Sequence, residues 1–120
     1  MGLPKVTTKL TSIQGNQESY EAIFLVDTGA TDSLAPADEL EKIGVFKEGK
    51  MTYESVDGSV KEYLFGLVRI EFIGETTAGR VIFGEPGSEP FLGVTALESV
   101  GIMVDPANKT LKRLPAIQLK

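Results

Sequence analysis

The segment Phe24-Leu25-Val26-Asp27-Thr28-Gly29-Ala30-Thr31 passes without a break from apolar residues to a carboxylate. Apolar residues occupy every position from 22 to 26, and a continuous run of this kind predicts a strand buried on both faces. A carboxylate at the end of such a strand is costly to bury unless hydrogen bonds or a function keep it there. Asp27 is therefore the first candidate for a functional residue.

The three residues after Asp27 suit a working carboxylate. Thr28 offers a hydroxyl to a hydrogen-bond network, and Gly29 lets the chain turn tightly, so that backbone N–H groups come near the carboxylate. Ala30 is small and leaves room for another molecule to approach. Asp, Thr and Gly are also common in turns, so a plain turn after a strand is the simplest alternative.

The surrounding chain predicts a single, mostly β domain over residues 1–120, with its core from about 5 to 114. The 13 glycines and 6 prolines are spread along the sequence and separate short elements. Asp57-Gly58 indicates a hairpin turn at 56–59, a second turn is expected at 14–17, and Gly44 suits the end of a helix. The expected strands are 5–13, 19–26, 51–55, 60–65, 67–73, 76–83, 102–104 and 110–114, and the expected short helices are 36–42 and 94–99.

The composition excludes several kinds of site. Cysteine and histidine are both absent, which rules out disulfides, thiolate or imidazole metal sites, a Cys nucleophile and a Ser-His-Asp triad. The net charge is −5 and the basic residues do not cluster, so no nucleic-acid partner is expected. No apolar run approaches the length of a membrane span, and no signal-peptide pattern opens the sequence, so we expect a cytoplasmic protein with no membrane attachment.

Taken in order along the chain, these features resemble the retropepsins, the retroviral-type aspartic proteases and their cellular relatives, and above all the prokaryotic branch. Residues 24–31 resemble the active-site segment, and residues 50–65 lie where the family has its flap hairpin. Phe91-Leu92-Gly93 resembles the second family signature, in which two apolar residues and a glycine, here ending in Leu92 and Gly93, precede a short helix, and residues 96–101 resemble that helix and its exit. The resemblance reaches to about residue 113 and implies a closed β-barrel, the half-unit of the acid-protease fold.

This resemblance implies an aspartic endopeptidase that works as a homodimer. Asp27 would lie beside its own copy, and the two carboxylates would share a proton and activate water. Thr28 would lock the two active-site loops together across the dimer. Gly29 and the flap residues Val56, Asp57 and Gly58 would bind a peptide or protein substrate as an extended strand. No metal and no organic cofactor is implied.

The sequence also departs from the family pattern. The flap tip holds one glycine, Gly58, where viral enzymes are glycine-rich, and Val94-Thr95 replaces the Arg that braces the viral dimer. Thr31 replaces an acidic residue, although Asp32 follows it. The alternative is therefore a catalytically weak or inactive binding or assembly module with the same fold. Asp105, which precedes Pro106, is expected to be a turn residue and not a second catalytic acid.

Overall fold

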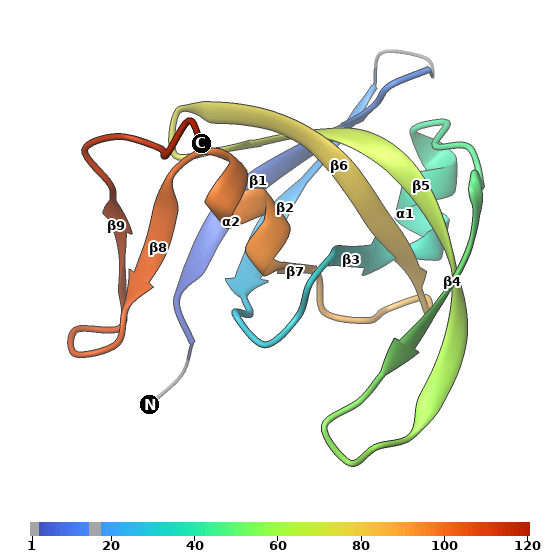
Figure 1. Cartoon of the computed structure of the whole chain (residues 1–120). Coiled ribbons are helices and arrows are strands. Elements are labelled where there is room, and N and C mark those ends of the chain that lie inside the picture. The colour runs from blue at the N-terminus through green and yellow to red at the C-terminus, as the bar shows by residue number, and fades with distance from the viewer. Residues whose placement is uncertain (1–2, 15–17) are drawn as a thin grey trace.

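The computed structural model describes residues 3–14 and 18–120 and has the mostly β architecture that the sequence predicts, with two short helices (Figure 1). Residues 15–17 of the expected first turn lie outside the described part of the chain. The elements are β1 (Lys5–Ser12), β2 (Ser19–Val26), β3 (Ser33–Pro36), α1 (Ala37–Lys42), β4 (Gly49–Glu54), β5 (Val60–Phe72), β6 (Glu75–Gly84), β7 (Phe91–Leu92), α2 (Val94–Ser99), β8 (Ile102–Asp105) and β9 (Thr110–Arg113).

Seven of the strands form one strongly curved sheet in the order β1-β2-β7-β3-β6-β5-β4. Strand β1 pairs with β5 as well as with β2, so both of its edges are hydrogen-bonded. The pairs β2–β7 and β3–β6 are parallel, and the other pairs are antiparallel. Strand β4 is the last in the order, and β8 and β9 form a separate two-stranded hairpin.

The core lies inside the curve of the sheet and is closed by the helices. The second half of strand β5 alternates, since Val68, Ile70 and Phe72 are buried while Arg69 on the opposite face is exposed. The other fully buried apolar side chains come from several strands and from both helices: Leu10, Phe24, Val26, Ala35, Leu40, Val81, Leu92 and Leu97.

Both helix predictions are confirmed to within a residue, and the first helix ends as its glycine suggests. Gly44 has a φ of 77°, and its N–H bonds to the Glu41 carbonyl at 3.1 Å. The next N–H, that of Val45, bonds to the Leu40 carbonyl at 3.0 Å. These two bonds form the motif with which glycine commonly ends a helix.

Three sequence expectations are corrected. Strand β2 is not buried on both faces: Phe24 and Val26 reach the core, but Ile23 points outward and is 63% exposed, because the core lies on one side of the strand only. Strand β5 runs unbroken through Gly66, where a Cβ would come within 2.4 Å of Val45, so this glycine permits close packing and does not end the strand. The short strands β3 and β7 were not expected.

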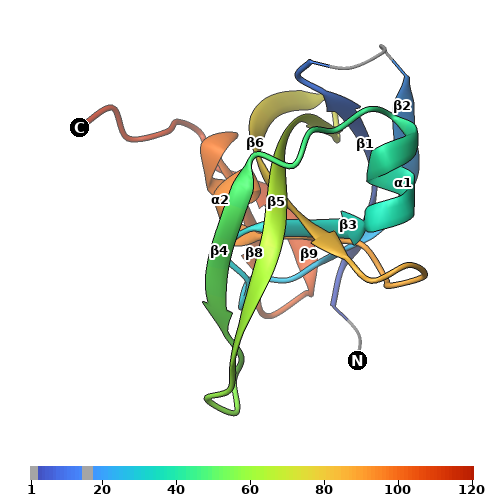
Figure 2. The same ribbon diagram turned by 90° about the vertical axis from the view of Figure 1, so that its right-hand side faces the viewer.

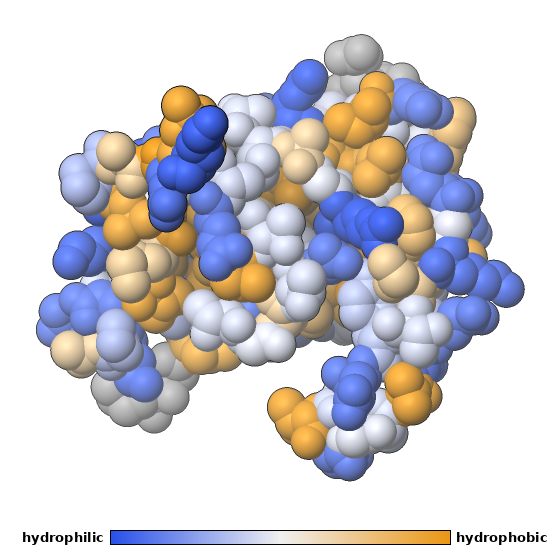
Figure 3. Space-filling view, in the orientation of Figure 1, coloured by the Kyte–Doolittle hydropathy of each residue, from blue (hydrophilic) through white to orange (hydrophobic). Residues whose placement is uncertain are grey.

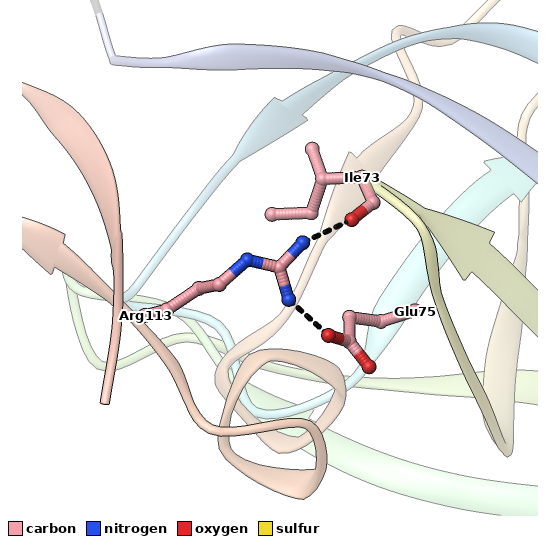
Figure 4. Close-up of polar contacts among 3 residues, drawn as sticks. All are labelled: Ile73, Glu75 and Arg113. Atoms are coloured by element: carbon pink, nitrogen blue, oxygen red, sulfur yellow. Dashed lines mark hydrogen bonds and ion pairs between the residues drawn. The ribbon is translucent and has the colours of Figure 1, made fainter. Parts of the chain in front are cut away.

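The β8–β9 hairpin is fastened to the β5–β6 turn by a side chain from β9 (Figure 4). The Arg113 guanidinium donates to the Glu75 carboxylate and to the Ile73 carbonyl. Ile73 and Gly74 form the two-residue turn with φ values of 41° and 79°, which is unfavourable for a β-branched residue. Arg113 therefore binds a turn that holds a β-branched residue at positive φ.

Candidate active site

Asp27 follows directly on β2 and begins a loop, residues 27–32, that we call the Asp27 loop. The Asp27 N–H bonds to the Leu92 carbonyl of β7 at 2.9 Å, which continues the pairing of β2 with β7. The side chain is half-buried, and its Oδ1 accepts the Gly29 N–H at 2.9 Å. The glycine turn predicted from the sequence thus does bring a backbone donor to the carboxylate, which orients it.

Residues 93–95, distant in sequence, hold the Asp27 loop on the side away from the groove. The N–H groups of Val94 and Thr95 bond to the carbonyls of Ala30 and Thr31 at 2.8 and 3.1 Å. The Gly93 N–H bonds to the buried Ser33 hydroxyl oxygen at 3.0 Å. This is close backbone packing, because the start of α2 lies directly against the loop.

Gly93 is required for that packing. A Cβ at this position would lie 2.6 Å from the Asp32 carbonyl carbon and oxygen and from the Thr31 carbonyl oxygen. Real Cβ atoms do not approach backbone so closely, so any side chain here would push the loop away. Leu92, its neighbour, is completely buried in the core. These two predicted residues therefore act as the support of the loop.

Strand β4 and the first half of β5 form a projecting hairpin, residues 49–65, which extends beyond the rest of the sheet (Figure 2). Its turn is tight: the Ser55 N–H bonds to the Ser59 carbonyl at 2.8 Å, and Gly58 has a φ of 87°. The Asp57 Oδ1 accepts both the hydroxyl and the N–H of Ser59, and these bonds hold the pKa of Asp57 below its usual value. The predicted Asp-Gly hairpin is confirmed.

Between the projecting hairpin and the Asp27 loop lies a groove of about 780 Å³, visible as a hollow at the lower edge of the molecule (Figure 3). Four of the predicted site residues line it: Asp27, Gly29, Ala30 and Val56. The apolar part of the lining comes from four strands, through Leu34, Met51, Ile82 and Phe91. The groove is therefore open, elongated along β4 and apolar in part.

The other predicted residues do not line the groove. Asp57 and Gly58 lie at the tip of the projecting hairpin, and Leu92 and Gly93 lie beneath the Asp27 loop. Thr28 is exposed, and within residues 3–14 and 18–120 its hydroxyl makes no hydrogen bond, either to Asp27 or to any other group. The expected contribution of Thr28 to a network around Asp27 is thus not found in one chain.

Most of the residues that line the groove were not among the predicted site residues, and Tyr53, Asp32 and Arg80 are the ones among them with notable polar contacts. The Tyr53 hydroxyl donates to Asp32 Oδ2 at 2.6 Å, and burial, followed by the Asp32 carboxylate, raises the pKa of Tyr53 to about 12. Arg80 of β6 lies over the Phe65 ring, 4.3 Å from its centroid. Tyr53 could have been suspected from its place beside the hairpin turn, but nothing local marks Arg80.

The chemistry available in the groove is that of carboxylates. Asp27 faces the groove with one hydrogen bond to its Oδ1, so its second oxygen can act on a water or a carbonyl group. Among the described residues, no cluster of three or more acidic side chains could hold a metal ion. Neither helix in the described part of the chain has the length and apolar character needed to cross a membrane.

No protein-family model and no curated protein matches this chain.

Proposed function

We propose that this chain is one subunit of a retropepsin-like aspartic endopeptidase whose active form is a homodimer. The observation that carries the proposal is the position of Asp27, at the end of a core strand, oriented by the Gly29 N–H and open to a groove beneath a projecting hairpin. The pairing of β1 with both β2 and β5 supports the finer proposal of a closed β-barrel, and the hairpin corresponds to the flap.

The dyad would form across a two-fold axis, because the chain supplies one Asp-Thr-Gly. Two carboxylates about 3 Å apart do not both ionise, so the pair holds one proton. The ionised Asp27 removes a proton from a water molecule, whose oxygen attacks the scissile carbonyl carbon. The protonated Asp27 donates its proton to the carbonyl oxygen, which gives a tetrahedral intermediate. As this intermediate breaks the C–N bond, the first Asp27 passes the proton that it took from water to the leaving nitrogen, and the second Asp27 takes back the hydroxyl proton, so that a carboxylic acid and an amine are released and the pair again holds one proton.

The substrate would be a peptide in extended form. Strand β4 is the last strand of the sheet, so its outer edge has backbone groups to offer to an added strand. Gly29 and Ala30 lie on the opposite wall of the groove and present little side chain. The Thr28 hydroxyl is exposed and makes no hydrogen bond within the described part of the chain, so it could meet its copy on the second subunit.

The test compares two Asp→Asn variants. D27N should lower the cleavage of unstructured peptides by roughly 10³-fold or more, because removal of a catalytic group costs at least this much in comparable sites. D105N is the matched control, since Asp105 makes the same kind of backbone bond on a distant hairpin, and it should cleave at the wild-type rate. Sedimentation at several concentrations should show a dimer.

Equal cleavage by wild-type protein and D27N would refute the proposal. If instead no peptide is cleaved, sedimentation shows a stable monomer and pepstatin does not raise the melting temperature of the wild type, the fold serves as a binding or assembly module and the endopeptidase assignment is wrong.

A further inference from the structure

The projecting hairpin is tied to the Asp27 loop by one side-chain hydrogen bond, from Tyr53 to Asp32. The distance of 2.6 Å is that of a strong bond to a carboxylate, and the pair is partly buried. Among the described residues, this is the only side-chain hydrogen bond between the hairpin, residues 49–65, and the loop, residues 27–32. Elsewhere β4 is paired along one edge only, with β5.

The surroundings hold the tyrosine ring in place for this bond. The Tyr63 ring of β5 meets the Tyr53 ring edge-on, with centroids 6.0 Å apart. Arg80, fixed on the Phe65 ring, lies close enough to Tyr53 to interact with its hydroxyl. The Tyr53 hydroxyl stays protonated, and so remains a donor, far above neutral pH. The contact is therefore built from three strands and does not depend on one flexible side chain.

We propose that Tyr53 is a positioning residue that sets the height of the hairpin above Asp27 by holding it to Asp32. The inference rests on the proposed function. Asp32 belongs to the same loop as Asp27, and Val94 and Thr95 fix the backbone of that loop from below. The hairpin and the Asp27 carboxylate are thus both held by the same loop, whose backbone is fixed by the start of α2. Tyr53 need not touch the reacting atoms for its loss to change how well a peptide is held.

The kinetic test separates binding from chemistry. Y53F should raise KM for peptides about tenfold, as expected for the loss of a hydrogen bond to a charged group, and leave kcat within about twofold. D32A should do the same, and the double variant should be no worse than D32A alone, because both changes remove one bond. D32N keeps an acceptor oxygen and should restore most of the loss. Y20F, which removes a hydroxyl far from the groove, is the control.

A second measurement does not depend on catalysis. Because the sequence has no cysteine, V60C and E98C place two spin labels on one chain at exposed positions of the hairpin and of α2. Labelled chains diluted into unlabelled protein report distances within one chain only. Y53F should broaden and lengthen the distance distribution, and Y20F should leave it unchanged.

A distribution in Y53F identical to that of the wild type would overturn the inference, whether or not the protein cleaves peptides. A loss of kcat with unchanged KM would also overturn it, because Tyr53 would then act on the chemical step. If the protein cleaves nothing and the labels still move apart in Y53F, the positioning role stands and the endopeptidase proposal alone fails.

Discussion

Asp27 and Asp105 make the same local contact in very different places. Each carboxylate accepts, at 2.9 Å, the N–H of the residue two positions later, Gly29 in one case and Ala107 in the other. Asp105 makes two further bonds, to the backbone and side chain of Asn108, and closes a turn at the surface between β8 and β9. Asp27 makes fewer bonds but stands between a supporting segment and a groove.

The difference shows that an Asp-containing turn is not by itself a site. At Asp105 the hydrogen bonds are local, within three residues, and they satisfy the carboxylate. At Asp27 the loop is held by residues 92–95, more than sixty positions away, which leave one face of the carboxylate open. A candidate active site is thus distinguished by the distant segment that supports its loop and by the groove that its carboxylate faces. Substitutions in the supporting segment test this distinction.

The largest effect is expected from removing the support of the Asp27 loop. In G93A the new Cβ would meet the backbone of Thr31 and Asp32 at 2.6 Å, and backbone cannot move aside as a flexible side chain can. We expect the free energy of unfolding to fall by about 3 kcal/mol, at the upper end for an overpacked site, together with loss of peptide cleavage. Urea denaturation measures the first effect and a peptide assay the second.

G79A is the matched control for this change. Gly79 lies in β6, where a Cβ would have nothing within 4 Å and the backbone needs no positive φ. Its stability should stay within about 0.5 kcal/mol of the wild type. If G93A were as stable as G79A, the Asp27 loop would not depend on residues 92–95. The proposed difference between the Asp27 loop and the Asp105 turn would then be wrong.

Several features of the fold and of the candidate site can be predicted from the sequence, because they depend on residues that are close together in the chain. The apolar run before Asp27, the Asp57-Gly58 turn and the end of α1 at Gly44 each depend on neighbours within a few residues. Leu92 and Gly93 were also among the predicted site residues, although their role as a backbone support emerges only when the loop and α2 are seen together.

The remaining features depend on contacts between distant segments. Gly66 looks like a strand break until Val45 is seen against it, and the exposure of Ile23 follows from the core lying on one side of β2. The Tyr53–Asp32 bond joins residues 21 positions apart through the curvature of the sheet. No periodic pattern encodes such contacts, because they are fixed by how strands pack and not by the order of residues within one strand.

A smaller effect is expected at the base of the Asp105 hairpin. R113A removes the bonds to Glu75 and to the Ile73 carbonyl, and with them the fastening of β8–β9 to the β5–β6 turn (Figure 4). Since the Arg113 side chain is 55% exposed, solvent weakens the ion pair, and we expect a loss of about 1 kcal/mol.

The control for that loss is K50A, which breaks the exposed Lys50–Glu62 pair at 3.8 Å and should cost less than about 0.5 kcal/mol. Cleavage should be normal in R113A, because the groove does not include this hairpin. A loss of cleavage as large as that in G93A would mean that the two regions are coupled and not independent.

The smallest effect concerns the Asp105 carboxylate itself and appears as a dependence on pH. Hydrogen bonds from the Ala107 N–H, and then from Asn108, hold the pKa of Asp105 below its usual value. A carboxyl group with a lowered folded-state pKa stabilises the protein above its unfolded pKa, about 3.9, and this contribution disappears as the pH falls through the folded value. D105N keeps an acceptor oxygen but cannot titrate. The melting temperature of the wild type should therefore lie slightly above that of D105N at neutral pH. This difference in melting temperature should disappear only on acidification below about pH 4. Asp57, whose pKa is lowered in the same way, is present in both proteins and cancels in the comparison. A gap that stays constant into strong acid would show that the turn is stabilised by its shape and not by its charge.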